Sequence, residues 1–169
     1  KSEAGKSVVL KLKIAPDVAN GILDQYELGP YNLIILGEPV RWKSELLAFF
    51  GAGVVQTVTT VAPSSVMVAR DPGSKRGFLI CTDGTSRSMQ AVRRAAVLAH
   101  VVGEPITLFS VAPDASAMAA AEEAVKNAAA LLKAMKIDVS QTKTAVGIPS
   151  EEIVETGSLY RVVAVTDEG

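Results

Sequence analysis

The chain has 169 residues, a formal net charge of −1 and an apolar fraction of 49%, which is enough to build a hydrophobic core of ordinary size. The nearly balanced charge and the scattered basic residues argue against a nucleic-acid-binding protein, and the single cysteine excludes a disulfide framework or a cysteine-based zinc site within the chain. Because no run of about 18 apolar residues predicts insertion into a membrane, we expect a cytoplasmic protein.

The first 70 residues alternate strand-like and helix-like patterns. Residues 8–14 place apolar side chains in alternation with lysines, which is the period of an edge strand with one face in water. Residues 31–37 are a continuous apolar run, which is typical of a central strand covered on both faces. The predicted elements are strands at 8–14, 31–37 and 65–70, with helices at 17–28 and 54–61 between them.

A buried strand that leads directly into a helix is predicted after residue 77. Residues 78–81 are apolar, the chain turns at Asp83-Gly84, and small or apolar residues then recur at helical spacing. Cys81 falls inside the apolar run and is expected to be a small buried hydrophobic residue. The face of the helix expected to meet the core consists of Ser88, Ala91, Ala95, Leu98 and Val102.

Three further strands and two helices complete the predicted elements. An alanine-rich pattern has one apolar stripe, typical of core packing: Met118, Ala121, Val125, Ala128, Leu132 and Met135. Pro149 begins a shorter helix, with two glutamates in its first turn. The predicted strands are 106–111, 139–146 and 162–165, and the predicted helices are 115–136 and 149–157.

The order of elements repeats within the chain. A strand, a helix, a tyrosine and an apolar strand occur in the same order before Gly37 and before Thr166, with Tyr31 and Tyr160 at matching positions. A repeat at a domain-sized interval suggests tandem copies of one α/β module.

These segments, taken in order, resemble the universal stress protein family. The similar segments are TDGTSRSMQAVRRAAVLA (82–99), VAPD (111–114), GIPSEEI (147–153), YNLIILG (31–37), YRVVAVT (160–166) and GVVQTVTTVAPSSVMVAR (53–70). Together they cover nearly the whole chain except residues 38–50. The resemblance implies an α/β fold of the Rossmann-like, adenine-nucleotide alpha-hydrolase-like kind, an open parallel sheet with helices on both faces.

The resemblance also implies a division into domains and an order of strands. Its strand order of 3-2-1-4-5 places the strand at 78–82 in the centre, between 106–111 and 162–165, with 139–146 at one edge. The implied domains are the later part of a first module at 1–70, a linker at 71–76, and a second module at 77–169 that lacks its last helix and strand.

In nucleotide-binding members of this family, a glycine-rich segment after the fourth strand lays backbone amides against phosphates. In the first module Gly37 is present, but Val40 stands at the second glycine position and the gap that follows is longer. Because a β-branched side chain obstructs close approach of a phosphate, we predict no nucleotide there. In the second module Thr166 replaces the first glycine and Gly169 matches the second.

The nucleoside end of the site is implied in the second module. Asp83 matches the family's acceptor for ribose hydroxyls, and Val111 matches the position where backbone and apolar surface meet adenine. An ordinary Asp-Gly turn, with Thr85 or Ser86 as the helix N-cap, is the structural alternative. The implied ligand is ATP or AMP, and the candidate binding residues are Thr82, Asp83, Gly84, Val111, Thr166 and Gly169.

Little in the sequence predicts catalysis. The only histidine, His100, lies late in a predicted helix, where a surface or boundary position is expected, and no Gly-x-Ser-x-Gly elbow or metal-ligand spacing occurs. We therefore expect a stress-response module that works by binding and association and not as an enzyme. The alternatives are an adenine-nucleotide sensor or slow ATPase, and a regulatory domain that acts on a membrane transporter or another signalling partner.

The strand at 65–70 predicts self-association. Its outer edge has no neighbour in the implied strand order, so its amides and carbonyls are available to a second chain. The edge carries Val66, Met67 and Val68 and has no proline or lysine to discourage pairing. We expect a homodimer through this edge, with the structural rival that the second module covers it.

Overall fold

The computed structural model divides into two compact units, Lys1–Ala69 and Arg70–Gly169, which we call the first and second units. The residues that it describes are 9–29, 31, 33–37, 53–54, 57–58, 60–62, 65–69, 75 and 77–166. The predicted linker at 71–76 therefore lies outside the described residues except for Lys75, as does Gly169 of the candidate site.

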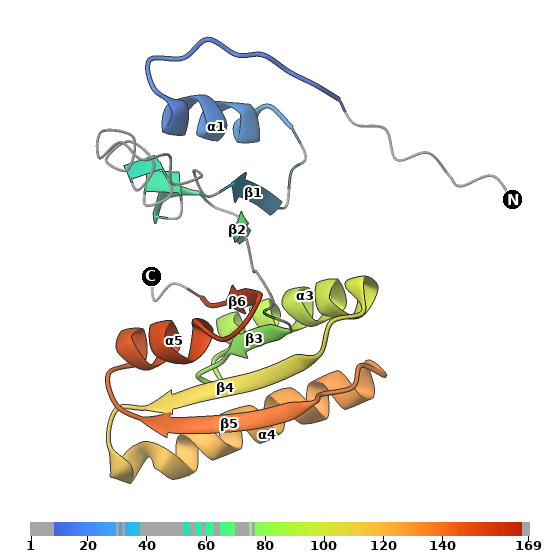
Figure 1. The fold of residues 1–169 in the computed structure, drawn as a ribbon, viewed down its shortest axis with the longest axis vertical. Coiled ribbons are helices and arrows are strands. Elements are labelled where there is room, and N and C mark those ends of the chain that lie inside the picture. The colour runs from blue at the N-terminus through green and yellow to red at the C-terminus, as the bar shows by residue number, and fades with distance from the viewer. Residues whose placement is uncertain are drawn as a thin grey trace, which may run out of the picture. The chain divides into compact units, whose positions relative to one another are not determined.

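The first unit combines a short helix, two parallel strands and a further helical stretch. Helix α1 (Val18–Glu27) begins where the Asp17 carboxylate accepts a hydrogen bond of 2.9 Å from the amide of Asn20. Strands β1 (Leu33–Gly37) and β2 (Ser65–Ala69) pair in parallel along their whole length (Figure 1). The described residues between 53 and 61 are helical, as predicted.

The core of this unit lies on one face of the two strands. Its buried residues are Ala19, Ile34, Leu36 and Val58. Leu33 and Ile35 alternate with the buried residues of β1 and are exposed. Within the described residues β1 pairs with β2 alone, so the expectation that this apolar run is a central strand covered on both faces is not met.

The edge strand predicted at 8–14 is wrong over its described part. Residues 9–15 pair with no strand among the described residues, and the side chains of Leu10, Leu12 and Ile14 are 96, 98 and 97% exposed. The lysines between them are instead held by polar partners, since Lys13 Nζ lies 3.3 Å from Asp24 Oδ2. Alternation of apolar and polar residues indicates which side chains would share a face of a strand. A strand also needs a neighbouring strand that forms hydrogen bonds with its backbone.

The second unit is built on a four-stranded parallel sheet in the order β5-β4-β3-β6 (Figure 1). Its strands are β3 (Phe78–Cys81), β4 (Ile106–Ala112), β5 (Gln141–Val146) and β6 (Val162–Ala164). The predicted topology is confirmed, because β3 is central and pairs in parallel with both β4 and β6 while β5 lies at an edge.

Helices cover both faces of this sheet, which confirms the predicted fold class. On one face, α3 (Ser86–Val102) and α4 (Met118–Ala134) pack against Phe78, Ile80 and Leu108. On the other, α5 (Pro149–Gly157) packs through Ile153 near Leu79 and Phe109. No helix among the described residues is long and apolar enough to cross a membrane.

The helices begin and end at residues suited to those positions. The Thr85 hydroxyl caps α3 by accepting from the amide of Ser88, and Gly103 ends the helix in the left-handed conformation. A 3-10 turn, η1 (Ala115–Ala117), precedes α4. Pro149 occupies the first turn of α5, where no amide donor is needed.

The predicted buried face is confirmed for the centre of α4 but is shifted for α3. The stripe predicted for α4 is confirmed in its centre, with both terminal methionines partly buried. On α3 the predicted stripe is wrong by about one residue: Ser88 is buried as expected, but Val102 is 54% exposed. The fully buried positions are Ser88, Val92, Ala96 and Ala99, whereas Ala95 and Leu98 of the predicted stripe are only partly buried against the same core.

Candidate functional site

The candidate site lies at the carboxyl end of β3. In an open parallel sheet, ligands bind in crevices outside the carboxyl ends of the strands, where loops and helix N-termini meet. Here β3 ends at Cys81 and α3 begins at Ser86, so residues 82–85 form the connecting loop. We call these four residues the β3–α3 loop.

Thr82 holds this loop in place from the inside. Its side chain is buried, and its Oγ1 accepts a hydrogen bond of 3.1 Å from the amide of Gly84. The same oxygen lies 3.0 Å from Ser88 Oγ, which ties the loop to the first turn of α3. Since the Thr82 amide donates to the Phe109 carbonyl at 2.9 Å, the loop is also fixed to β4. Thr82 is thus placed to position the loop.

Asp83 is the exposed acidic group of the loop. Its Oδ1 accepts hydrogen bonds from the Thr85 amide at 2.9 Å and from the Thr85 hydroxyl at 2.7 Å. Partial burial acts to raise the pKa of this carboxyl, but the hydrogen bonds from the Ser88 and Thr85 side chains and from nearby amides outweigh it and lower the pKa below 3.8.

The direction of this shift sets how the group depends on pH. Because the carboxylate is stabilised in the folded state, its contribution to folding is fully present above the ordinary pKa of 3.8 and is lost as the pH falls through the lower folded value. At neutral pH the loop therefore presents a negative charge.

Gly84 allows the loop to turn beside α4. Its φ is +83°, a conformation that side chains with a β-carbon rarely adopt, and an added Cβ would lie 3.2 Å from the Cβ of Ala124. Asp83 and Gly84 thus form the Asp-Gly turn expected from the sequence. Of the two candidate caps, Thr85 is the N-cap and Ser86 is the first helical residue.

The neighbouring strand β4 supplies the apolar side of the site. Cys81 pairs with Phe109 and the Thr82 amide donates to the Phe109 carbonyl, so the β3–α3 loop begins beside β4, two residues before Val111. Val111 is partly buried and packs on the α5 face of the sheet beside Ala145 and Tyr160. The exposed Asp83 carboxylate therefore follows the end of β3, and the partly buried Val111 lies near the end of the adjacent strand β4.

Asp114 follows β4 and was not among the candidate residues. It caps η1 by accepting hydrogen bonds from the amides of Ser116 and Ala117 and from the Ser116 hydroxyl. These bonds, led by the one from the Ser116 side chain, lower the pKa of its carboxyl. The Asp-x-Ser sequence is a common turn signal and would have identified it.

Thr166 lies on the opposite side of β3. Ile80 pairs with Ala164, the last residue of β6. Thr166 is partly buried, two residues beyond the end of β6. Five candidate residues thus lie at or just beyond the carboxyl ends of three adjacent strands: Thr82, Asp83, Gly84, Val111 and Thr166.

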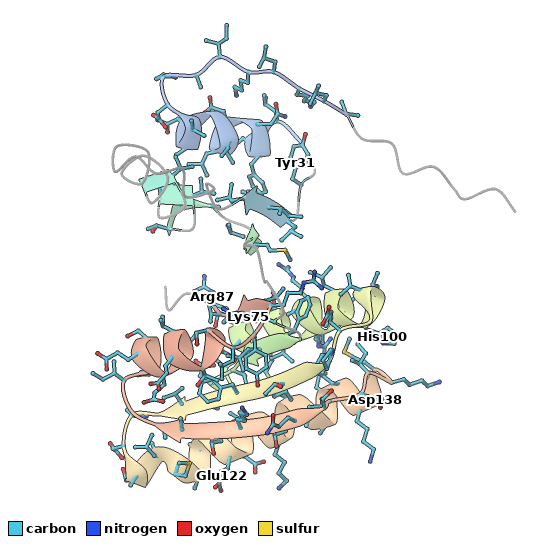
Figure 2. The ribbon with its side chains drawn as sticks, in the orientation of Figure 1. Tyr31, Lys75, Arg87, His100, Glu122 and Asp138 are labelled. Atoms are coloured by element: carbon cyan, nitrogen blue, oxygen red, sulfur yellow. The ribbon has the colours of Figure 1, made fainter. Side chains whose placement is uncertain are left out.

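Two other chemically notable residues do not belong to this edge. Cys81 is buried, as predicted, and desolvation raises the pKa of its thiol to about 12, so the thiolate that would react is scarce at neutral pH. His100 is exposed in the last turn of α3, at the other end of the helix from Thr85, and it lines a cavity of about 330 Å³ with Asp138 (Figure 2).

Three residues of the β3–α3 loop, Asp83, Gly84 and Thr85, are exposed. A second cavity, of about 390 Å³, lies between α4 and β5 and is lined by residues such as Glu122 and Thr144. Neither cavity includes a residue of the β3–α3 loop. Among the described residues, no group of three or more histidine, cysteine, aspartate or glutamate side chains could hold a metal ion.

Comparison with known proteins places these features in a family. The model of the universal stress protein family matches residues 76–168, more than half of the chain, and this span includes β3, the β3–α3 loop and β6. Among solved structures, the chain is similar to a universal stress protein in complex with cAMP, at 17% identity over 55% of this chain and 77% of that one, with a TM-score of 0.46. No curated protein matches. The chain belongs to the universal stress protein family.

Proposed function

We propose that the second unit is a binding module for an adenine nucleoside or its phosphate, and that it acts by binding and association without turnover. The observation that carries this proposal is the placement of the Asp83 carboxylate, which is exposed, ionised at neutral pH and held by a braced loop. It lies in the loop that follows β3, and Val111 lies near the end of the adjacent strand β4, so both are at the carboxyl ends of a parallel sheet, where ligands bind.

The chemistry of the two groups suits the two ends of a nucleoside. A carboxylate accepts hydrogen bonds from the vicinal hydroxyls of ribose, and such bonds to a charged group are stronger than neutral ones. The partly buried Val111 offers apolar surface to a base. Since the loop is already fixed by Thr82 and Thr85, little conformational entropy is lost when a ligand binds it.

Binding without turnover is supported by the roles that the polar groups already have. The Thr85 hydroxyl donates to Asp83 and accepts from the Ser88 amide, and the Thr82 hydroxyl is buried against Ser88. His100, the chain's one histidine, is at the far end of α3 from the loop. The groups at the loop therefore position one another, and we assign none of them as a nucleophile or a general base.

Calorimetry with AMP and with ATP tests the proposed ligand. We expect weak binding by the wild type and a loss of about tenfold or more in affinity for Asp83→Ala, because one charge-assisted interaction is removed. Asp138→Ala is the matched control, since Asp138 is also an exposed aspartate but lies by His100, and it should bind as the wild type does. Equal affinity of Asp83→Ala and the wild type would exclude Asp83 from the site.

We also propose that two chains associate through β2. The parallel partner β1 occupies one edge of β2, and the other edge has no partner strand among the described residues. Val66 and Met67 on this strand are partly buried within the unit, whereas the side chain of Val68 lies outside the description. A backbone edge with apolar neighbours favours antiparallel pairing with an identical edge.

Light scattering at high salt measures this association, because pairing of backbone groups depends little on ionic strength. The wild type should have the mass of a dimer, and both Val66→Pro and Met67→Lys should be monomeric. Val9→Pro is the control, since Val9 is 73% exposed outside any strand. A monomeric wild type, or a dimer that tolerates both substitutions in β2, would rule the contact out.

A further inference from the structure

Strand β5 has one open edge. It stands at the end of the sheet order β5-β4-β3-β6, where it pairs in parallel with β4 on one side (Figure 1). Within the part of the chain that the structure describes, no strand pairs with its other side. Because the residues of a strand direct their amides and carbonyls alternately to its two sides, about half of these groups on β5 face away from β4. Such an edge can accept a further strand from a partner.

A groove follows this edge on the α4 side of the sheet. The cavity of about 390 Å³ is lined by residues of both α4 and β5. Thr142 pairs with Leu108, which packs in the core cluster with α4, so Thr142 and Thr144 face α4. Val125 and Ala129 line the cavity from the helix and give it an apolar floor. A groove between a helix and an open strand edge is a place where the side chains of an added strand can be held.

The charge within this groove is negative. Glu122 lines it (Figure 2) and has no ion-pair partner among the described residues. Lys126 also lines it, but its Nζ lies 3.5 Å from a carboxylate oxygen of Glu123. An acidic side chain is therefore disfavoured in the groove, whereas the floor favours an apolar one.

The opposite face of β5 carries a positive charge. Lys143 pairs with Phe109, which packs on the α5 side of the sheet, so Lys143 faces that side. Its Nζ lies 5.7 Å from the centre of the Tyr160 ring, which holds the ammonium group near the sheet. No carboxylate among the described residues forms an ion pair with Lys143. A strand added at this edge is therefore stabilised by an acidic side chain opposite Lys143.

The charge of Lys143 argues against the chain itself as the occupant of the edge. Residues 9–14 have the alternation of a strand and no partner strand, but their apolar side chains alternate with Lys11 and Lys13. If the apolar side chains entered the groove, these lysines would face Lys143, and like charges on neighbouring strands are destabilising. Pairing of two β5 edges would likewise bring a second Lys143 to the contact, and a lysine on an edge strand discourages such self-pairing.

We infer that this edge binds an extended peptide of another protein, in which apolar and acidic residues alternate. The apolar side chains enter the groove over Val125 and Ala129, and the acidic side chains lie on the other face of the sheet, beside Lys143. Backbone pairing with β5 supplies affinity, and the alternating side chains supply specificity. Glu122 adds to this specificity because it repels peptides whose acidic residues would enter the groove.

Synthetic peptides with blocked ends and the length of β5 test the inference on the full chain, by fluorescence anisotropy. A peptide that alternates valine with glutamate should bind. One that alternates valine with lysine should bind about tenfold or more weakly, because its charges face Lys143. Methylation of the backbone nitrogens of the first peptide keeps its side chains but removes its donors, and should abolish binding.

Substitution of Lys143 tests the proposed origin of the preference. Lys143→Glu should reverse the preference between the glutamate and lysine peptides, and Lys143→Gln should remove it. Arg93→Glu is the matched control, since it changes the net charge as much at an exposed position of α3 and lines neither cavity. This control should bind as the wild type does, and circular dichroism will check that all three variants fold.

Hydrogen exchange locates the bound peptide. Alternate amides of β5 should become protected when the glutamate peptide is added, whereas the amides of α3 should not change. The inference is overturned if the wild type binds neither peptide or both equally, if methylation leaves the affinity unchanged, or if Lys143→Glu keeps the wild-type preference. Protection of β5 that rises with protein concentration alone would also overturn it, because a second copy would then occupy the edge.

Discussion

Replacement of Leu108 by alanine is expected to lower the free energy of unfolding of the second unit by about 3 kcal/mol. Leu108 lies on β4 with no exposed surface, in the cluster formed by Phe78, Ile80 and Leu132. Truncation removes buried methyl groups and leaves a cavity between the sheet and two helices, and close-packed side chains relax only partly into such a space.

Native-state hydrogen exchange is the measurement suited to this prediction. The chain has two units, so a single unfolding transition does not report on one of them. Exchange of the β3 and β4 amides reports on the second unit alone. Val101→Ala is the control, because Val101 is 74% exposed and its loss should change stability by less than about 0.5 kcal/mol. A change for Leu108→Ala as small as that of the control would show that this cluster is not the core.

Replacement of Glu104 by alanine is expected to cost the second unit a similar amount, about 3 kcal/mol, by a different mechanism. The Glu104 carboxylate accepts a hydrogen bond of 2.9 Å from the Gly77 amide and lies 2.7 Å from Nη1 of Arg161. The residue stands before β4, Gly77 before β3 and Arg161 before β6. One carboxylate thus joins the beginnings of three strands, and its side chain is only 15% exposed.

Removal of this carboxylate leaves a largely buried amide without its acceptor and a guanidinium without its counter-charge. Arg161→Ala is the matched comparison: the arginine side chain is 48% exposed, so its loss should cost about 1 kcal/mol or less. Hydrogen exchange of amides in β3 and β6 will measure the loss of stability caused by each substitution. Equal and small effects of the two substitutions would show that the carboxylate contributes no more than a surface ion pair.

The sheet of the second unit could be predicted because its two central strands, β3 and β4, are buried on both faces. Such strands appear in the sequence as short continuous apolar runs, and the run at 78–81 is buried at every position. The helices between them begin or end at clear signals, such as Pro149 at the start of α5 and Gly103 at the end of α3. Together with the family's strand order, these features were enough to place β3 in the centre.

The first unit shows the limit of the same reasoning. Residues 9–14 have the alternation of a strand, but the structure leaves their apolar side exposed and their backbone unpaired within the described residues. Alternation reports which side chains share a face. The neighbouring strand depends on residues distant in the sequence, and local pattern does not encode them.

The candidate site could be predicted in its position but only partly in its roles. Asp83-Gly84 after an apolar run indicates a turn at the carboxyl end of a strand, and the structure has that turn. The inward direction of the Thr82 hydroxyl and its contact with Ser88 depend on how α3 packs over the strand. Sequence spacing therefore identified the loop. Which of its side chains is buried and holds the loop, and which is exposed, is known only from the structure.

A titration of the isotopically labelled chain with AMP, followed through its amide NMR signals, tests the proposed binding function most directly. Binding as proposed should shift the signals of Asp83, Gly84 and Thr85 together with those of Val111 and Ala112, the two strand ends that meet at the site. Signals around His100 and Asp138, which line the separate cavity, should not move. AMP is added to millimolar concentration, which detects a dissociation constant of up to about 1 mM. The account would be contradicted if the spectrum did not change, or if the shifts were confined to residues away from the β3–α3 loop.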